Sequence, residues 1–296
     1  MELSLRAYFA RQSNFKNMRD EMKKKILKVL PVLVLLTTRC LYGQDLAATT
    51  SLISSVINDI AKGRIETATL VPPGSCPGHF DLKTNDLKTI EKTGILLAHG
   101  YEEYLGQIIR SVKNPHFAPV IVGIEDNWLV PDVQKQVYRE ISRILSDRFP
   151  QYGILFARNI KKAEEEINRT DREIKELAVE KHLKGIPVIC NDYIKEILEY
   201  IGFDVVATYG RKEELTPSSI KNLMAVSRAR NVRVVIDNLQ AGLDTGKIFS
   251  DELGISHLAI SNFPGVFPGT PTLRQTLYEN AKRIITVYEN SKNPAD

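Results

Sequence analysis

The chain has 296 residues and a formal net charge of +4, but this charge is unevenly distributed. Residues 1–43 hold nine Lys or Arg and three Asp or Glu, a net of +6, so the rest of the chain carries a net −2. A nucleic-acid-binding protein needs a clustered basic face, and the distribution argues against this class. No Walker loop, GxSxG or HExxH motif is present, so a phosphate-binding or hydrolytic function has no local support.

The first 43 residues are typical of an export signal. Three lysines follow Met22, which is itself a possible start, and residues 26–36 form an apolar run interrupted by one Lys and one Pro. That length suits a signal peptide and is short for a spanning helix of roughly 20 residues. We expect cleavage after Gly43, lipidation at Cys40 or retention as a membrane anchor. All three place the protein outside the cytoplasm, in the periplasm or at the outer cell surface.

After residue 43, short apolar runs alternate with amphipathic stretches. The expected elements are a strand at Ala47–Ser51, a helix at Leu52–Lys62, a strand at Glu66–Val71, a helix at Asp86–Lys92, a strand at Gly94–Ala98, a helix near Glu103–Ser111, a strand at Pro119–Ile124 and a helix at Pro131–Phe149. This alternation predicts a parallel sheet with helices on its faces.

One long helical segment follows, from about Tyr152 to Lys184, with no internal proline and many charged residues. It would measure on the order of 45 Å, enough to run along two domains. Gly185 and Pro187 end it. Its expected apolar side is marked by Ile154, Phe156, Ile160, Ile167, Ile174 and Leu177.

A second strand–helix series follows the long helix. Its expected elements are strands at Pro187–Cys190, Asp204–Thr208, Val232–Ile236 and His257–Ile260, and helices at Tyr193–Ile201, 216–228, Leu243–Leu253 and Thr272–Asn290. Thr216 is the expected N-cap of the second of these helices. The sequence predicts an α/β fold with two lobes, residues 44–151 and 186–296, linked by the helix of residues 152–185.

Ligands of open parallel sheets bind beyond the carboxyl ends of the strands. This rule selects five residues that follow or close strands, namely Cys76, His79, Asp126, Cys190 and Asp237. Thiolate, imidazole and carboxylate donors together suit zinc better than calcium or magnesium. His99 also follows a strand, and we expect it to support the ligands.

The segment from Val71 to Asp86 contains Val-Pro-Pro-Gly and, further on, Cys76 and His79. It resembles the signature of the extracytoplasmic metal receptors of zinc and manganese ABC transporters. In an ungapped alignment the family's first histidine falls on Gly78, with His79 one place later. Cys76 stands where the family usually has Asp.

The resemblance extends over essentially the whole chain after residue 43. The family's second histidine falls on Asp126 and its third on Asn191, beside Cys190, while its acid matches Asp237, which Asn238 follows. At most one of the three histidines therefore remains. The resemblance implies a monomeric, non-enzymatic receptor that binds zinc, with manganese or another divalent ion as alternatives, and delivers it to an ABC permease.

Two alternatives stay open. Receptors of the same fold bind chelated metals, haem or corrinoids, and the missing histidines favour such a ligand. In a disulfide-bridged adhesin, by contrast, Cys76 and Cys190 would be paired and no ligand would bind, since export permits disulfides. For the metal receptor, Asn191 and Asn238 are expected to lie beside the metal ligands.

Overall fold

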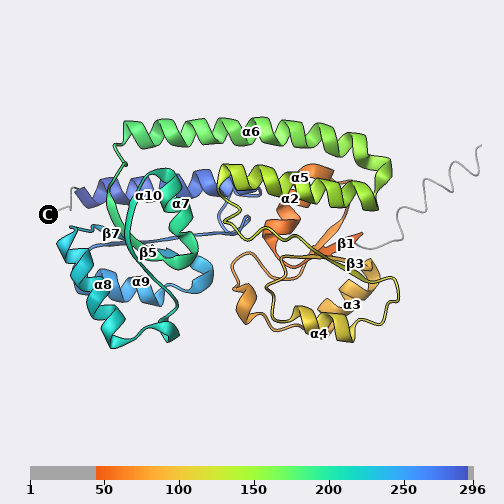
Figure 1. Cartoon of the computed structure of the whole chain (residues 1–296), viewed down its shortest axis with the longest axis horizontal. Coiled ribbons are helices and arrows are strands. Elements are labelled where there is room, and N and C mark those ends of the chain that lie inside the picture. Colours follow the sequence, from red (N-terminus) through yellow and green to blue (C-terminus); the bar gives the residue numbers. More distant parts are fainter. Residues whose placement is uncertain (1–44, 293–296) are drawn as a thin grey trace, which may run out of the picture. The chain divides into compact units, whose positions relative to one another are not determined.

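A computed structural model describes residues 45–292 of the chain (Figure 1). The predicted export signal lies outside these residues. None of the helices formed by residues 45–292 combines the length and the hydrophobicity that a membrane span requires.

The first lobe is built on a four-stranded sheet in the order β2-β1-β3-β4, in which all neighbours are parallel. Its strands are β1 (Leu46–Ala48), β2 (Thr67–Thr69), β3 (Ile95–Ala98) and β4 (Ala118–Ile121). Its helices are α2 (Ser51–Ala61), α3 (Thr84–Thr93), α4 (Leu105–Ser111) and α5 (Pro131–Arg148). Helices α2 and α5 lie on one face of the sheet and α3 and α4 on the other (Figure 1).

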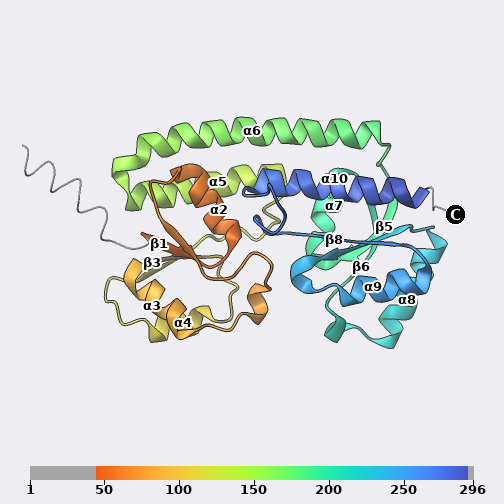
Figure 2. The same cartoon turned by 180° about the vertical axis from the view of Figure 1, so that it is seen from behind.

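The second lobe repeats this plan with the parallel strand order β6-β5-β7-β8. Its strands are β5 (Pro187–Asn191), β6 (Asp204–Tyr209), β7 (Val234–Asn238) and β8 (Ser256–Ile260). Its helices are α7 (Lys195–Ile201), α8 (Pro217–Ala229), α9 (Asp244–Leu253) and α10 (Leu273–Lys292). Helices α7 and α10 cover one face, and α8 and α9 the other (Figure 2).

Helix α6 (Gly153–Glu180) connects the lobes. Its 28 residues span about 42 Å, and it packs on α2 and α5 as well as on α7 and α10 (Figures 1 and 2). These features confirm the predicted α/β fold of two lobes joined by a long helix. The helix ends at Glu180, earlier than expected, because the chain turns at His182, whose φ is +52°.

One expectation for α6 was wrong. Ile154 does not belong to the apolar side, since its side chain is 92% exposed. It lies two positions from the fully buried Phe156, and two positions correspond to roughly 200° around a helix. The buried stripe instead contains Phe156, Asn159, Ala163, Ile167, Thr170 and Ile174.

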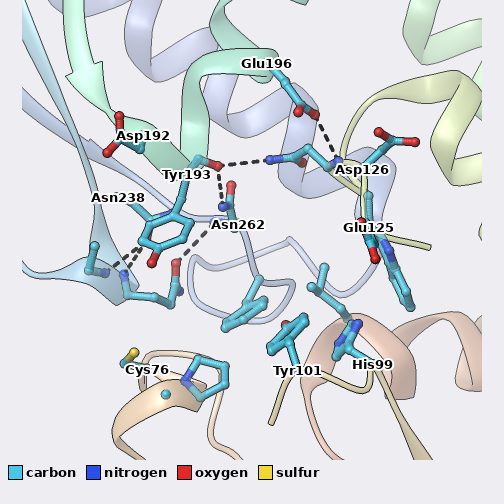
Figure 3. Close-up of a pocket in the computed structure, with 18 of the residues that line it drawn as sticks. Cys76, His99, Tyr101, Glu125, Asp126, Asp192, Tyr193, Glu196, Asn238 and Asn262 are labelled. Carbon is cyan, nitrogen blue, oxygen red and sulfur yellow. Dashed lines mark hydrogen bonds between the residues drawn. The ribbon is translucent and has the colours of Figure 1, made fainter. Parts of the chain in front are cut away.

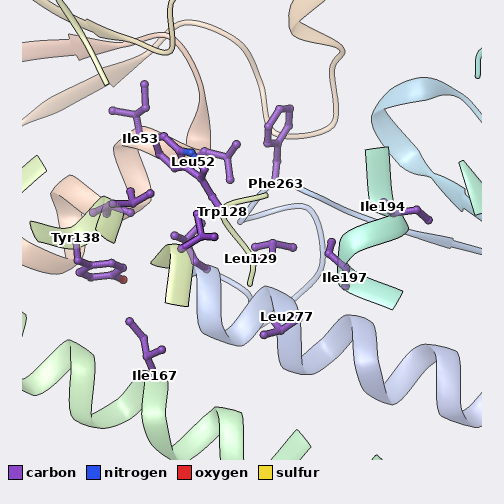
Figure 4. Close-up of a cluster of buried hydrophobic side chains, with 14 of the residues drawn as sticks. Leu52, Ile53, Trp128, Leu129, Tyr138, Ile167, Ile194, Ile197, Phe263 and Leu277 are labelled. Carbon is purple, nitrogen blue, oxygen red and sulfur yellow. The ribbon is translucent and has the colours of Figure 1, made fainter. Parts of the chain in front are cut away.

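One of the buried hydrophobic clusters extends across the two lobes. Trp128 and Leu129, which follow β4, belong to the same buried cluster as Phe263, Ile197 and Leu277 of the second lobe (Figure 4). Burial of apolar side chains stabilises a fold by about 25 cal/mol per Å². A shared core therefore resists a wide separation of the lobes.

Local sequence explains where two helices of the second lobe begin and end. Thr216 is the N-cap of α8, as predicted, because its hydroxyl accepts a hydrogen bond from the backbone N–H of Ser219 at 3.1 Å. Helix α7 ends at Gly202, whose φ of +114° is accessible mainly to glycine. Thr216 therefore starts α8, and Gly202 directs the chain from α7 into β6.

Candidate functional site

A pocket of about 740 Å³ lies at the carboxyl ends of the strands of both sheets (Figure 3). The segments that follow all eight strands contribute to its lining, which confirms the expectation of a ligand cleft between the lobes. Four aromatic side chains form part of the wall, namely Tyr101, Trp128, Tyr193 and Phe263.

Cys76 and His79 lie in the pocket, on the loop after β2. Cys76 precedes a short 3-10 turn, Pro77–His79, and its carbonyl accepts a hydrogen bond from the His79 N–H at 3.2 Å. Cys76 is half-buried and His79 is exposed. The turn brings a thiol and an imidazole to the same part of the pocket.

Both side chains contact one guanidinium group from the second lobe. Arg211 donates from Nη2 to Cys76 Sγ at 2.9 Å, and its Nη1 lies 3.3 Å from His79 Nε2. Arg211 follows β6, and its own backbone N–H donates to Glu214 at 2.9 Å. Because the two guanidinium nitrogens belong to one planar group, the sulfur and the imidazole nitrogen converge on one small region.

Asp126 also lines the pocket, but at its other end. Figure 3 shows Asp126 and Glu125 well separated from Cys76. The adjacent Asn127 connects the lobes, since its N–H donates to Glu196 at 3.0 Å and its Nδ2 to the Tyr193 carbonyl at 3.1 Å. The structure does not bring Asp126 together with the Cys76–His79 pair.

Cys190 and Asp237 do not line the pocket, although both were predicted as ligands. Cys190 is fully buried in β5, where burial raises the pKa of its thiol well above the ordinary value. The Asp237 carboxylate is also fully buried, and it accepts a hydrogen bond from Tyr209 at 2.8 Å and lies 2.7 Å from His257 Nε2. The Cys190 side chain belongs to the buried hydrophobic cluster, and the Asp237 carboxylate accepts a hydrogen bond from the N–H of Gly246 in α9 at 3.1 Å, so neither side chain turns into the pocket.

The three residues predicted to support the ligands have distinct positions. His99 lines the pocket, with its Nε2 2.8 Å from the Thr50 hydroxyl and its ring stacked on Tyr101, and burial lowers its pKa to about 4. Asn238 lines the pocket as well, and its side chain accepts hydrogen bonds from the backbone of residues 240 and 241. Asn191 is buried away from the pocket, where its Nδ2 donates to the Tyr209 carbonyl at 3.2 Å.

The charge of the pocket favours cations. Its lining contains five carboxylates, from Glu103, Glu125, Asp126, Asp192 and Glu196, against the single guanidinium of Arg211. A cleft lined mainly by one sign of charge concentrates ions of the opposite sign.

Among residues 45–292, no group of three or more His, Cys, Asp or Glu side chains is arranged to hold a metal ion. Cys76 and Cys190 are both free thiols.

Sequence reasoning missed Arg211 and Asp192. Asp192 follows β5 directly, and Arg211 comes two residues after the end of β6. The strand-end rule that selected Cys76 therefore also applied to them.

Two lobes with parallel sheets, a long connecting helix and a pocket at the strand ends define the fold of a two-lobed solute receptor. A family model described as "Zinc-uptake complex component A periplasmic" matches residues 46–287. The chain therefore belongs to this family.

Individual proteins are also similar to this chain, in sequence or in fold. A protein of Thermotoga maritima named "Putative metal-binding protein" is 28% identical over 193 residues, which are 62% of this chain. The match spans 64% of that protein's length. Among solved structures, the Mn-bound periplasmic metal binding protein of Candidatus Liberibacter asiaticus is similar in fold, with a TM-score of 0.70 and 16% identity over 82% of this chain and 99% of that one. A crystal structure of ZnuA is similar in fold with a TM-score of 0.70 and 14% identity, and the match covers 83% of this chain and 99% of that one.

Proposed function

We propose that this protein is an extracytoplasmic receptor that captures a divalent transition metal, with zinc as the first candidate, and delivers it to an ABC permease. Family membership supports the general role. The observation that carries the proposal for this chain is the convergence of Cys76 Sγ and His79 Nε2 on one cationic group in an acidic pocket.

The donor chemistry supports zinc. Sulfur and nitrogen ligands are typical of zinc sites, with distances of about 2.3 Å and about 2.0 Å, whereas calcium and magnesium prefer oxygen. Cys76 and His79 would supply these two donors. Asp126 and the other pocket carboxylates would complete the site after a rearrangement of the loops. Cys190 and Asp237 would need larger movements, since both are fully buried.

The remaining parts of the proposal concern the cellular context. The export segment predicted at residues 1–43 and the periplasmic description of the family support a location outside the cytoplasm. A monomeric receptor that passes metal to a membrane permease needs no catalytic group. We therefore assign binding and release of the ion, and no reaction, to this pocket.

Elemental analysis of the full chain purified without chelator tests the proposal. We expect one zinc per chain in the wild type and a loss of most of it in Cys76→Ser and in His79→Ala. His116→Ala is the matched control, because His116 is exposed and does not line the pocket. Full metal content in both pocket variants would overturn the proposed site.

A second candidate is a metal held by a small organic chelator. The pocket volume of about 740 Å³ falls in the range of small-molecule sites, and its aromatic wall suits an organic ligand. Mass spectrometry of the material released on denaturation separates the two candidates. An organic compound in equal amount with the metal would favour the chelate, and metal alone would favour the free ion.

A further inference from the structure

The Arg211 side chain occupies the region that a captured cation would need. Its two terminal nitrogens contact the sulfur of Cys76 and the imidazole of His79, the same two atoms that the proposed function assigns to the metal. It reaches them from the opposite lobe, so this contact also bridges the cleft. A positive group thus takes the place of the ion between these two donors.

The partners of this guanidinium are weak ones. Within residues 45–292, the hydrogen-bond contacts of the Arg211 guanidinium are with Cys76 and His79, and its buried Nε has no hydrogen-bond partner. A cysteine sulfur is a poor hydrogen-bond acceptor. The aromatic ring of Tyr193 lies 5.9 Å from the guanidinium carbon, near the limit of a cation–π contact. Such contacts hold the side chain in place less firmly than a bidentate carboxylate would.

The loop after β2 leaves room for this arrangement. A Cβ added at Gly78 would lie 3.5 Å from Arg211 Nη2 and 3.7 Å from Cys76 Sγ. Gly78 is the position to which the family alignment assigns its first histidine. A larger side chain there would project toward the space that the guanidinium fills.

We propose that Arg211 is an internal competitor of the captured metal, a proposal that rests on the proposed function of the pocket. An ion binds Cys76 and His79 only when the guanidinium leaves them. Arg211 therefore determines how tightly an ion must bind these two donors in order to occupy the site. Removing the guanidinium lowers the dissociation constants of different ions by a common factor, because each ion displaces the same group. Ions that bind thiolate and imidazole weakly do not displace the guanidinium and stay unbound.

Zinc and manganese affinities of the full chain test this proposal, measured by competition with a chromophoric chelator. The variants are Arg211→Met and, in case that protein does not fold, Arg211→Gln. Arg230→Met is the matched control, since Arg230 belongs to the same lobe but pairs at the surface with Asp204. We expect Arg211→Met to bind both ions at least about tenfold more tightly, the control to match the wild type, and a further Cys76→Ser change to abolish the gain.

Each other outcome has a definite meaning. Unchanged or weaker binding in the Arg211 variants, with zinc still bound by the wild type, would overturn the competitor role and leave the proposed function intact. An equal gain in metal affinity in Arg230→Met would show a general effect of removing a positive charge and would also overturn the competitor role. If Arg211→Met binds zinc while the wild type does not, and Cys76→Ser abolishes this binding, the competitor role of Arg211 is supported. Binding by neither protein would overturn the proposed function itself.

Discussion

Arg274 Nη1 of α10 and Asp59 Oδ2 of α2 form an ion pair with a separation of 2.6 Å, in which Asp59 is buried and Arg274 is largely buried. Tyr138 of α5 donates to the same carboxylate oxygen at 2.7 Å, and Glu166 of α6 pairs with the other end of the guanidinium. Burial alone would raise the pKa of Asp59, but the hydrogen bond from Lys62 and the charge of Arg274 hold it below its ordinary value. Four helices are therefore tied together behind the pocket.

Replacing Arg274 by Met should lower the free energy of unfolding by about 3–5 kcal/mol, because Asp59 is left buried with its charge incompletely paired. Urea denaturation followed by circular dichroism measures the change. Arg143→Met is the control, since Arg143 forms only exposed ion pairs on α5 and should unfold like the wild type. Equal stability of the two variants would contradict a structural role for the buried pair.

His99 should make the protein acid-sensitive. Burial lowers its pKa to about 4 in the folded state, against about 6.5 when unfolded, while the charge of Glu102 acts in the opposite direction. The unfolded chain therefore binds a proton more readily between these values, and stability falls as the pH drops from about 6.5 toward 4. In His99→Gln, urea midpoints measured across this range should decline less steeply. An equally steep decline of the urea midpoint in His99→Gln and in the wild type would contradict the lowered pKa of His99 as the source of the acid sensitivity.

Gly246 at the start of α9 should not tolerate alanine. A Cβ at this position would lie 2.3 Å from Asp237 Oδ2, so the buried carboxylate or the helix would have to move. We expect a loss of about 2–4 kcal/mol in Gly246→Ala. In Gly106→Ala the nearest atom is the flexible end of Arg110 at 3.4 Å, and stability should stay the same or rise. Thermal unfolding compares the two, and similar melting of both would contradict the packing described for Asp237.

Metal binding should change the spacing of the lobes only slightly. Helix α6 and the shared core connect them, and Gln240 donates across the cleft to the Pro73 carbonyl at 2.9 Å. Small-angle scattering profiles of metal-free and metal-loaded protein should therefore superimpose. A marked compaction on loading would contradict the rigid connection.

The fold was predictable because strand–helix alternation and the long helical segment follow directly from hydrophobic periodicity. The limits proposed for the two domains stay a prediction. The site was less predictable, because periodicity does not show which side chain at a strand end turns into the cleft. Cys76 and His79 are in the pocket, whereas Asp237 turns into a buried cluster with His257, which is 20 residues away in the sequence. Arg211 meets Cys76 across 135 residues, a contact that only the folded chain reveals.

The most direct test of the metal site is X-ray absorption at the zinc edge of the loaded protein, comparing the wild type with Cys76→Ser. The account predicts one sulfur ligand at about 2.3 Å together with imidazole nitrogen in the wild type, and loss of that sulfur in the variant. A zinc shell made only of oxygen and nitrogen, identical in both proteins, would contradict capture of the ion by Cys76 and His79.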